Sequence, residues 1–212
     1  PKDLEGSTLG APPPDGAWAQ FPAFAKANGI DMAKITVEPV GFPTREPMLA
    51  EGKVNSVTGF SFSSYLNLIK LGVPESDIST ILMADHGLKL YGNAIIVNSD
   101  FAKENEVAVK SFLKAIAAGW RDAIADPSKA VASLVKRNPA ADTELEKRRL
   151  MLAVDANVLT GNVKENGMGL INEGRFGEAI AQLGETYEYK GVPDINLIFT
   201  AEYLPVGGFS LK

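Results

Sequence analysis

The sequence has 212 residues, of which 45% are hydrophobic and 22% charged, enough chain to bury a core without disulfides or metals. It contains no cysteine and a single histidine, His86, which excludes thiol catalysis, cysteine-ligated metal sites and histidine clusters. A net charge of −5 without a basic run argues against a nucleic-acid partner, and no apolar stretch reaches the roughly 20 residues of a membrane-spanning helix. We expect an ordinary folded chain that carries no cofactor and no metal.

Strand-like and helix-like stretches alternate over the first 97 residues. Strands are predicted at residues 8–11, 35–40, 54–58, 80–83 and 94–97. Helices are predicted from an Asp15 N-cap to a stop at Asn28-Gly29, from a Thr44 cap to Gly52, and from Ser63 to Lys70, closed by Gly72. This alternation implies right-handed βαβ units and a mainly parallel sheet with helices on both faces, so the predicted fold class is α/β.

From Ser99 onward the apolar residues follow a helical period. Helices are predicted from Phe101 to Asp126-Pro127 and at residues 128–137, 143–159 and 173–187. One strand candidate, residues 94–97, stands beside these helices, which is too little sheet for a second α/β half. We therefore expect Phe112, Ile116 and Trp120 to be covered by another chain or by a segment that precedes this one.

Ligands of open parallel sheets bind beyond the carboxyl ends of the strands, where loops lead into helices. The predicted loops of this kind are residues 12–18, 41–46 and 58–62. The first contains Gly16 but no Gly-Lys-Ser/Thr pattern, so it is a weak candidate for a phosphate loop. Asp15 would place a carboxylate where the following helix could otherwise bind an anion, which favours a neutral or cationic ligand. The alternative is that Asp15 is only a helix cap.

The run Thr58-Gly59-Phe60-Ser61-Phe62 is the most informative of these loops. A glycine at a strand end allows close approach to the backbone, and its neighbours offer hydroxyl groups and two aromatic rings. Phe60 and Phe62 either sandwich a flat ligand or belong to the core.

Other candidates lie near the same predicted edge. Arg45 and Glu46 begin the second helix and either face the crevice or form a solvated pair. Trp18, one turn into the first helix, either stacks on a ligand or packs in the core. His86 follows Asp85 but has no partner placed by a motif, so a structural role is predicted for it.

Several segments, in this order and spacing, resemble solute-binding proteins of ABC importers. The matching segments are residues 1–10 (PKDLEGSTLG), 21–26 (FPAFAK), 45–49 (REPML), 57–60 (VTGF), 91–96 (YGNAII), 112–115 (FLKA) and 199–205 (FTAEYLP), with Gly119-Trp120 and Asp126-Pro127. The family is the group that binds nitrate, sulfonates, taurine and thiamine-pyrimidine precursors, and it includes thiamine-pyrimidine synthases. The resemblance extends over nearly the whole chain.

The resemblance implies a periplasmic-binding-protein type II-like fold with two α/β lobes. Residues 1–88 would be the complete second lobe, and residues 89–212 the return crossing with the helical portion of the first. The rest of the first lobe, about 100 residues or one small domain, would precede Pro1 together with a signal peptide and half of the ligand site.

The same resemblance implies capture of a small solute between lobes that close by a hinge, and delivery to an ABC permease in the membrane. It thus implies a periplasmic binding protein rather than an enzyme, monomeric when full-length. The implied ligand-binding residues are Asp15, Gly16, Arg45, Glu46, Thr58, Gly59, Phe60 and Ser61, with Trp18 as a candidate from the first helix and with Tyr91 and Asn93 at the return crossing.

The solute class stays open at this point. Sulfonate and nitrate binders of the family usually place a small residue and a hydroxyl at the first helix start. Asp15 departs from that pattern and favours an aromatic heterocycle or an amine over an oxyanion. Family enzymes that make the thiamine pyrimidine use a histidine and a cysteine-rich iron site, and this sequence has no cysteine. A catalytically silent interaction domain is the third alternative.

Overall fold

In the computed structural model, which describes residues 1–187 and 189–211, the chain divides into two compact units. The first unit consists of Pro1–Leu90 and Glu178–Val192, and the second of Tyr91–Gly177 and Pro193–Lys212. We describe each unit by itself. In the described part of the chain, no helix combines the length and the apolar run that crossing a bilayer requires.

The first unit is built on a small parallel sheet. Its strands are β1 (Thr8–Ala11), β2 (Thr36–Pro39) and β3 (Ser56–Val57), and within the described residues their order is β2-β1-β3. Thr8 lies opposite Thr36 on one side of β1, and Leu9 lies opposite Ser56 on the other. The predicted parallel pairing is therefore confirmed, with β3 shorter than the predicted residues 54–58.

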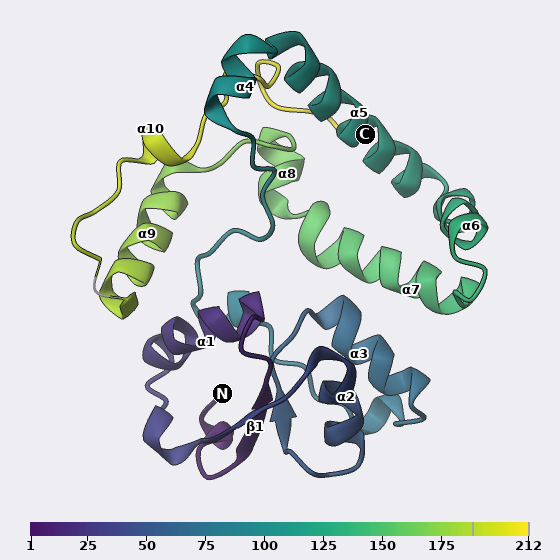
Figure 1. The fold of residues 1–212 in the computed structure, drawn as a ribbon, viewed down its shortest axis with the longest axis vertical. Helices are drawn as coiled ribbons and strands as arrows, with labels where there is room; N and C mark the ends of the chain where they lie inside the picture. Colours follow the sequence, from purple (N-terminus) through teal and green to yellow (C-terminus); the bar gives the residue numbers. More distant parts are fainter. Residues whose placement is uncertain (188, 212) are drawn as a thin grey trace. The chain divides into compact units, whose positions relative to one another are not determined.

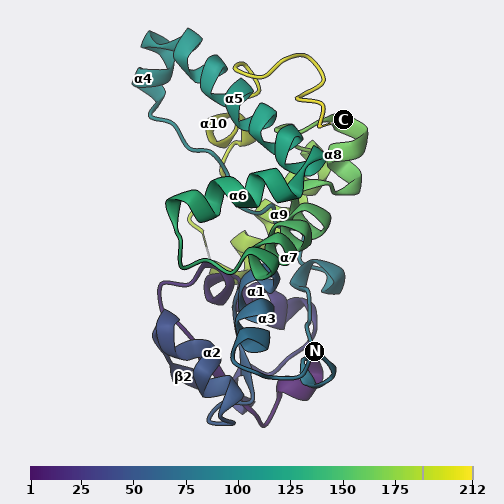
Figure 2. The ribbon, with the colours of Figure 1, turned by 90° about the vertical axis from the view of Figure 1, so that its right-hand side faces the viewer.

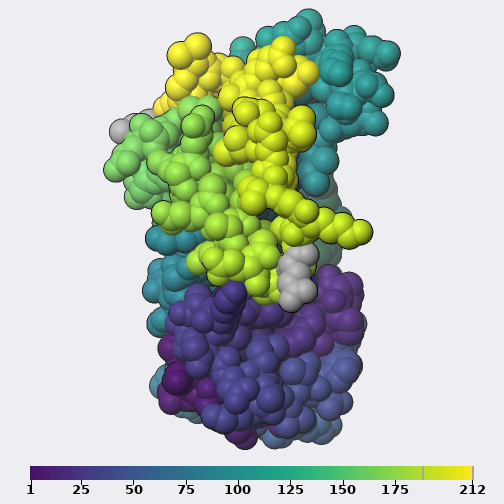
Figure 3. Space-filling view, turned by 90° about the vertical axis from the view of Figure 1, so that its left-hand side faces the viewer, coloured from purple at the N-terminus to yellow at the C-terminus, as the bar shows by residue number. Residues whose placement is uncertain are grey.

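Helices pack on both sides of β1, as right-handed crossovers require. They are α1 (Gly16–Ala27), α2 (Phe42–Ala50) and α3 (Ser61–Lys70). Figure 1 shows α1 on one side of β1, with α2 and α3 on the other. The core under α1 consists of buried apolar residues: Leu9, Phe21, Phe24, Ala25, Ile30 and Ile35. On the face drawn in Figure 3, the purple and blue atoms of this unit form one closely packed body.

Helix α2 begins earlier than predicted. Gly41 is its N-cap, and Thr44, the predicted cap, lies inside the first turn with its hydroxyl donating to the Gly41 carbonyl at 3.1 Å. Pro43 explains the earlier start, because a proline near a helix N-terminus has a suitable backbone angle and no N–H to leave unpaired there.

Two predicted strands are absent from the described structure. Residues 80–82 are extended but unpaired and lead into a 3₁₀ turn, Met83–His86, while residues 94–97 are irregular. Apolar residues form a strand only when a neighbouring strand accepts their backbone hydrogen bonds. The sheet of the described residues ends at β2 and β3, and Ile96 is 91% exposed.

The second unit is helical. Its helices are α4 (Ser99–Glu104), α5 (Glu106–Ala125), α6 (Pro127–Arg137), α7 (Thr143–Ala153), α8 (Gly161–Asn166) and α10 (Ile195–Ile198). The predicted long helix is interrupted at Asn105, and α7 continues as a π turn, Val154–Val158, before residue 159. Figure 2 shows α6 between α5 and α7, both of which it contacts. Figure 3 shows yellow C-terminal atoms beside green ones. In this unit Phe209 pairs with Met168 in an isolated antiparallel bridge.

Helix α9 (Glu173–Tyr187) contributes residues to both units. Within the first unit, the Gln182 carboxamide donates to the Gly87 carbonyl at 2.7 Å and accepts from the Lys89 N–H at 2.9 Å. The two bonds reproduce the pairing that a neighbouring strand would offer.

On α5, Phe112 is 55% exposed, while Ile116 and Trp120 are half-buried.

Candidate functional site

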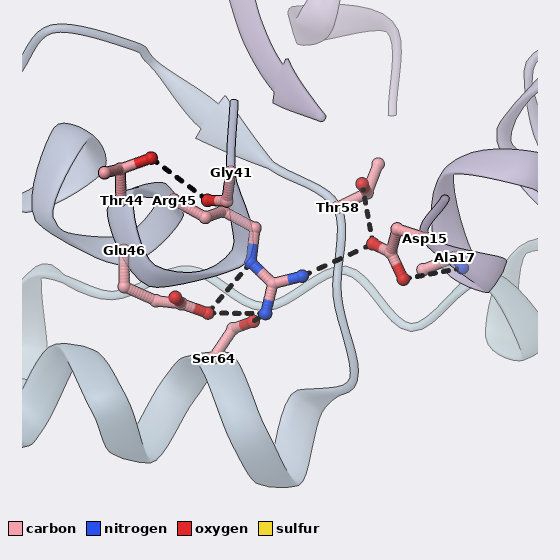
Figure 4. A network of polar contacts seen from close by, with 8 residues as sticks. All are labelled: Asp15, Ala17, Gly41, Thr44, Arg45, Glu46, Thr58 and Ser64. Carbon is pink, nitrogen blue, oxygen red and sulfur yellow. Dashed lines mark hydrogen bonds and ion pairs between the residues drawn. The ribbon is translucent and has the colours of Figure 1, made fainter. Parts of the chain in front are cut away.

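A buried polar cluster lies where the carboxyl ends of β1 and β3 meet the first turns of α2 and α3. Its members are buried: Asp15, Arg45, Glu46, Thr58 and Ser64 (Figure 4). Buried charges cost free energy unless they are paired, so a cluster of this kind needs a specific arrangement to persist. This is the candidate site.

Asp15 connects the first loop to the cluster. Its Oδ1 accepts from the Ala17 N–H at 3.2 Å, which confirms the predicted N-cap of α1. Its Oδ2 accepts from Arg45 Nη1 at 3.3 Å and from the Thr58 hydroxyl at 3.2 Å. Both carboxylate oxygens are therefore engaged within the protein.

Arg45 is the centre of the cluster. Its Nε and Nη2 donate to Glu46 Oε1 at 2.9 and 2.6 Å, and Nη2 also donates to Ser64 Oγ at 3.0 Å. With the Nη1 bond to Asp15, all three guanidinium nitrogens donate to neighbouring side chains (Figure 4). Because both residues are buried, the alternative of a solvated Arg45–Glu46 pair is wrong.

The cluster has an excess of negative charge. Asp15 and Glu46 carry two carboxylates against the single guanidinium of Arg45, a formal balance of −1. The N-terminus of α1 offsets part of this charge, because the Ala17 N–H donates to the Asp15 carboxylate there. The arrangement disfavours an anion at this edge of the sheet and favours a neutral or cationic partner.

Gly59 packs its backbone directly against the cluster. A Cβ placed there would overlap Ser64 Oγ and lie 3.1 Å from Arg45 Cζ. A side chain at this position would therefore displace the groups that hold Arg45. The sequence predicted that a glycine at the end of the third strand would allow a group to approach the backbone closely. In the structure, that group is the guanidinium of Arg45.

Phe60 and Phe62 follow Gly59 and stack on each other. Their ring centroids are 5.3 Å apart at an interplanar angle of 18°. The two rings pack directly on each other, which leaves no room for a ligand ring between them in this structure. Phe60 is 42% exposed, so its ring is not a core side chain either. The aromatic pair therefore lies partly at the protein surface.

The remaining candidates of the first unit lie near the cluster or in the core. Gly16 and Ser61 are the first residues of α1 and α3, and Gly16 is exposed while Ser61 is half-buried. Trp18 packs against the core and stacks on Phe21 with centroids 5.6 Å apart. His86, predicted to be structural, packs edge-on against Phe24 at 6.4 Å.

Tyr91 and Asn93 belong to the second unit. The Tyr91 hydroxyl accepts from the Asn172 N–H at 2.8 Å, and Arg175 lies 4.4 Å above the Tyr91 ring. Phe176 packs on the same ring at 6.0 Å. Tyr91 is thus held by the start of α9, while Asn93 is exposed.

Sequence reasoning missed Ser64. Its signal was that Ser64 lies one helical turn after Phe60, in a segment where Ser61, Ser63 and Ser64 are interspersed with aromatic residues. A buried serine on the inner face of a helix needs a hydrogen-bond partner, and here that partner is Arg45.

Two surface hollows lie elsewhere, in the second unit. One, of about 510 Å³, is lined by residues 103–108 and Ser111, and the other, of about 150 Å³, is lined by residues of α9, α10 and the segments beside them. We place the candidate site at the cluster instead, because it gathers buried charges at the sheet edge where α/β proteins bind ligands. Among the described residues, no group of histidine or acidic side chains is arranged to hold a metal.

A parallel β-α-β sheet with polar side chains at its carboxyl edge is typical of α/β proteins that bind small molecules. Residues 1–130 match the NMT1/THI5-like family, and the chain belongs to this family, whose members have a periplasmic-binding-protein fold. The resemblance to solute-binding proteins indicated by the sequence is thereby confirmed.

Similarity to a named binding protein agrees with this family assignment. The chain is 27% identical over 214 residues to a protein of Chloroflexus aurantiacus (strain ATCC 29366 / DSM 635 / J-10-fl) named riboflavin-binding protein RibY. The match covers 98% of this chain and 58% of the relative, so the chain spans less than two thirds of that protein's length.

Proposed function

We propose that this chain captures a small, flat, neutral or cationic heterocycle as the solute-binding component of an ABC importer. The observation that carries the proposal is the partly exposed Phe60 ring, which stacks on Phe62 and follows Gly59 at a buried cluster with an excess negative charge. Family membership and the name of the relative support a solute-binding role.

The charge balance supports the choice of solute class. An oxyanion such as nitrate or a sulfonate would approach two carboxylates that a single guanidinium already neutralises only in part. A neutral ring meets no such repulsion, and one with N–H groups is favoured by the negative potential.

Riboflavin is the specific solute we propose to test. It is a flat, uncharged heterocycle, and it is the compound that the relative is named for. An aromatic ring on the exposed face of Phe60 would gain about 0.5–1.5 kcal/mol from stacking beyond the area that it buries.

The residues differ in the roles that we propose for them. Phe60, Ser61 and Gly16 would contact the solute, because they are the exposed or half-buried residues at this edge. The cluster residues, together with Gly59, would shape the floor beneath it. Trp18, Tyr91 and Asn93 are further proposed contacts that rest on the family resemblance.

The proposed partners and location follow from the family. Solute-binding members are extracytoplasmic, so we place the protein outside the cytoplasmic membrane, delivering its solute to an ABC permease. We assign it no catalytic step: the Thr58 hydroxyl donates to the Asp15 carboxylate, but both residues are buried and Asp15 also accepts from Arg45 and the Ala17 N–H.

Calorimetry of riboflavin binding to the full chain tests the proposal. Phe60→Ala should weaken binding by about two- to tenfold, the equivalent of one aromatic stack. Phe101→Ala, on α4, is the matched control because Phe101 is 51% exposed in the second unit, and it should leave the affinity unchanged. Saturable binding of taurine or nitrate, with riboflavin inert, would overturn the assignment.

A further inference from the structure

We infer that Arg45 is a positioning residue, which fixes the three loops at the carboxyl edge of the sheet without itself contacting the solute. The inference rests on the proposed function for its consequence in binding. Its structural part, the joining of three loops by one guanidinium, stands independently of any solute.

One guanidinium reaches all three crossovers of the first unit. Nη1 donates to Asp15, in the loop between β1 and α1, 30 residues away along the chain. Nη2 donates to Ser64 of α3, 19 residues away, and Nε with Nη2 hold Glu46 on Arg45's own helix, α2. Because Asp15 also accepts from Thr58, the end of β3 is bound into the same network.

The direction of these bonds argues against direct contact with a solute. The Arg45 side chain is only 7% exposed, and each of its nitrogens donates into the protein. Four of its five N–H groups thus donate to the Asp15 and Glu46 carboxylates or to the Ser64 hydroxyl, and the small exposed fraction leaves little of the guanidinium for a solute.

Gly59 connects Arg45 to Phe60, the proposed solute contact. Its backbone lies so close that an added Cβ would be 3.1 Å from Cζ and 3.2 Å from Nη1 of Arg45. Phe60 is the next residue in the chain. A shift of the guanidinium therefore moves the backbone that carries the Phe60 ring.

Arginine is required because of its shape as well as its charge. Its planar guanidinium presents donors in a fixed fork, whereas a lysine ammonium is a compact point charge on a flexible stem. Arg45→Lys keeps the formal balance of the cluster but cannot reach Asp15, Glu46 and Ser64 in the same geometry. The substitution therefore changes how residue 45 positions its neighbours while leaving its charge the same.

Hydrogen exchange on the full chain without ligand tests the structural part. In Arg45→Lys, amides in residues 15–18, 44–49 and 59–65 should all exchange about tenfold faster or more, while α7 is unchanged. Arg137→Lys is the control, because Arg137 is exposed and donates to the Ser133 carbonyl of its own helix, and it should change none of these segments. Faster exchange confined to α2, or none, would overturn the inference.

Ser64→Ala provides a milder variant in case Arg45→Lys does not fold. It removes one acceptor of Arg45, so faster exchange should extend from residues 59–65 to residues 15–18. A change restricted to α3 would contradict the inference.

Riboflavin titration of the same variants tests the consequence for binding. Arg45→Lys should weaken binding about tenfold at a temperature where both proteins are folded, while Arg137→Lys should bind as the parent does. If the parent does not bind riboflavin, the solute proposal fails and the exchange experiment still decides the positioning role. If Arg45→Lys binds as tightly as the parent, the positioning role in binding is wrong.

Discussion

Asp15 and Glu46 illustrate how burial changes the meaning of a residue that sequence analysis selects. The sequence placed both at the carboxyl edge of the sheet and predicted ligand contacts for them. The structure places both there, but pairs them with Arg45 at less than 5% exposure. Loss of either carboxylate would leave a buried guanidinium with fewer partners, so alanine variants are expected to affect stability before binding.

Asp15→Ala should lower the free energy of unfolding by about 2–4 kcal/mol, because it removes a helix cap and a charge-assisted hydrogen bond to Arg45, which keeps Glu46 as its partner. Urea denaturation measures this loss. Asp31→Ala is a matched control, because Asp31 also accepts from the N–H two residues on but is exposed. The control should lose only about 1 kcal/mol, as for an ordinary cap. Equal losses would show that the Arg45 pair contributes little.

Glu5 provides a pH-dependent contribution at the surface. The N–H of Asp31, and then the Lys34 ammonium, hold the pKa of the Glu5 carboxyl below its usual value. A carboxyl whose pKa is lowered by folding stabilises the protein above its unfolded-state pKa, and this stabilisation is lost as pH falls through the folded-state pKa. Glu5→Gln should therefore be less stable than the parent at pH 7, and the difference should shrink in acid. A difference that is constant with pH would contradict this.

At the scale of elements, the sequence predicted the strands and helices whose ends depend on nearby residues. The apolar run of residues 8–11, the Asp15 cap and the Asn28-Gly29 stop gave β1 and α1 nearly residue by residue. The strand predicted at residues 94–97 is absent, because a strand depends on a neighbour far away in the sequence and the described chain provides none there. The predicted Thr44 cap was wrong, because Pro43 suits the first turn of a helix and α2 therefore begins earlier.

The docking of α9 on the first unit gives a prediction at this scale. Gln182→Glu keeps an acceptor for the Lys89 N–H but loses the donor to the Gly87 carbonyl, while Gln182→Leu loses both. Amide exchange at Lys89 should therefore stay slow in the first variant and become fast in the second. Equal exchange in the two variants would show that the side chain does not pair with residues 87–89.

At the scale of the whole molecule, the sequence predicted the α/β beginning, the helical continuation and the family. The edge at which the candidate residues gather followed from strand order, because parallel strands bring their carboxyl ends together. The pairing inside the cluster could not be predicted, since Ser64 and Gly59 join Arg45 only through packing of α2 against α3. Likewise, the stacking of Phe60 on Phe62 depends on side-chain directions that the sequence does not specify.

The central claim is that a flat heterocycle binds at the carboxyl edge of the first unit's sheet. A riboflavin titration of the ¹⁵N-labelled full chain, followed through its amide chemical shifts, tests it most directly. Our account predicts saturable shifts at Gly16, Gly59 and Ser61 that follow one binding curve. No saturable binding, or shifts confined to the helices between residues 99 and 137, would contradict it.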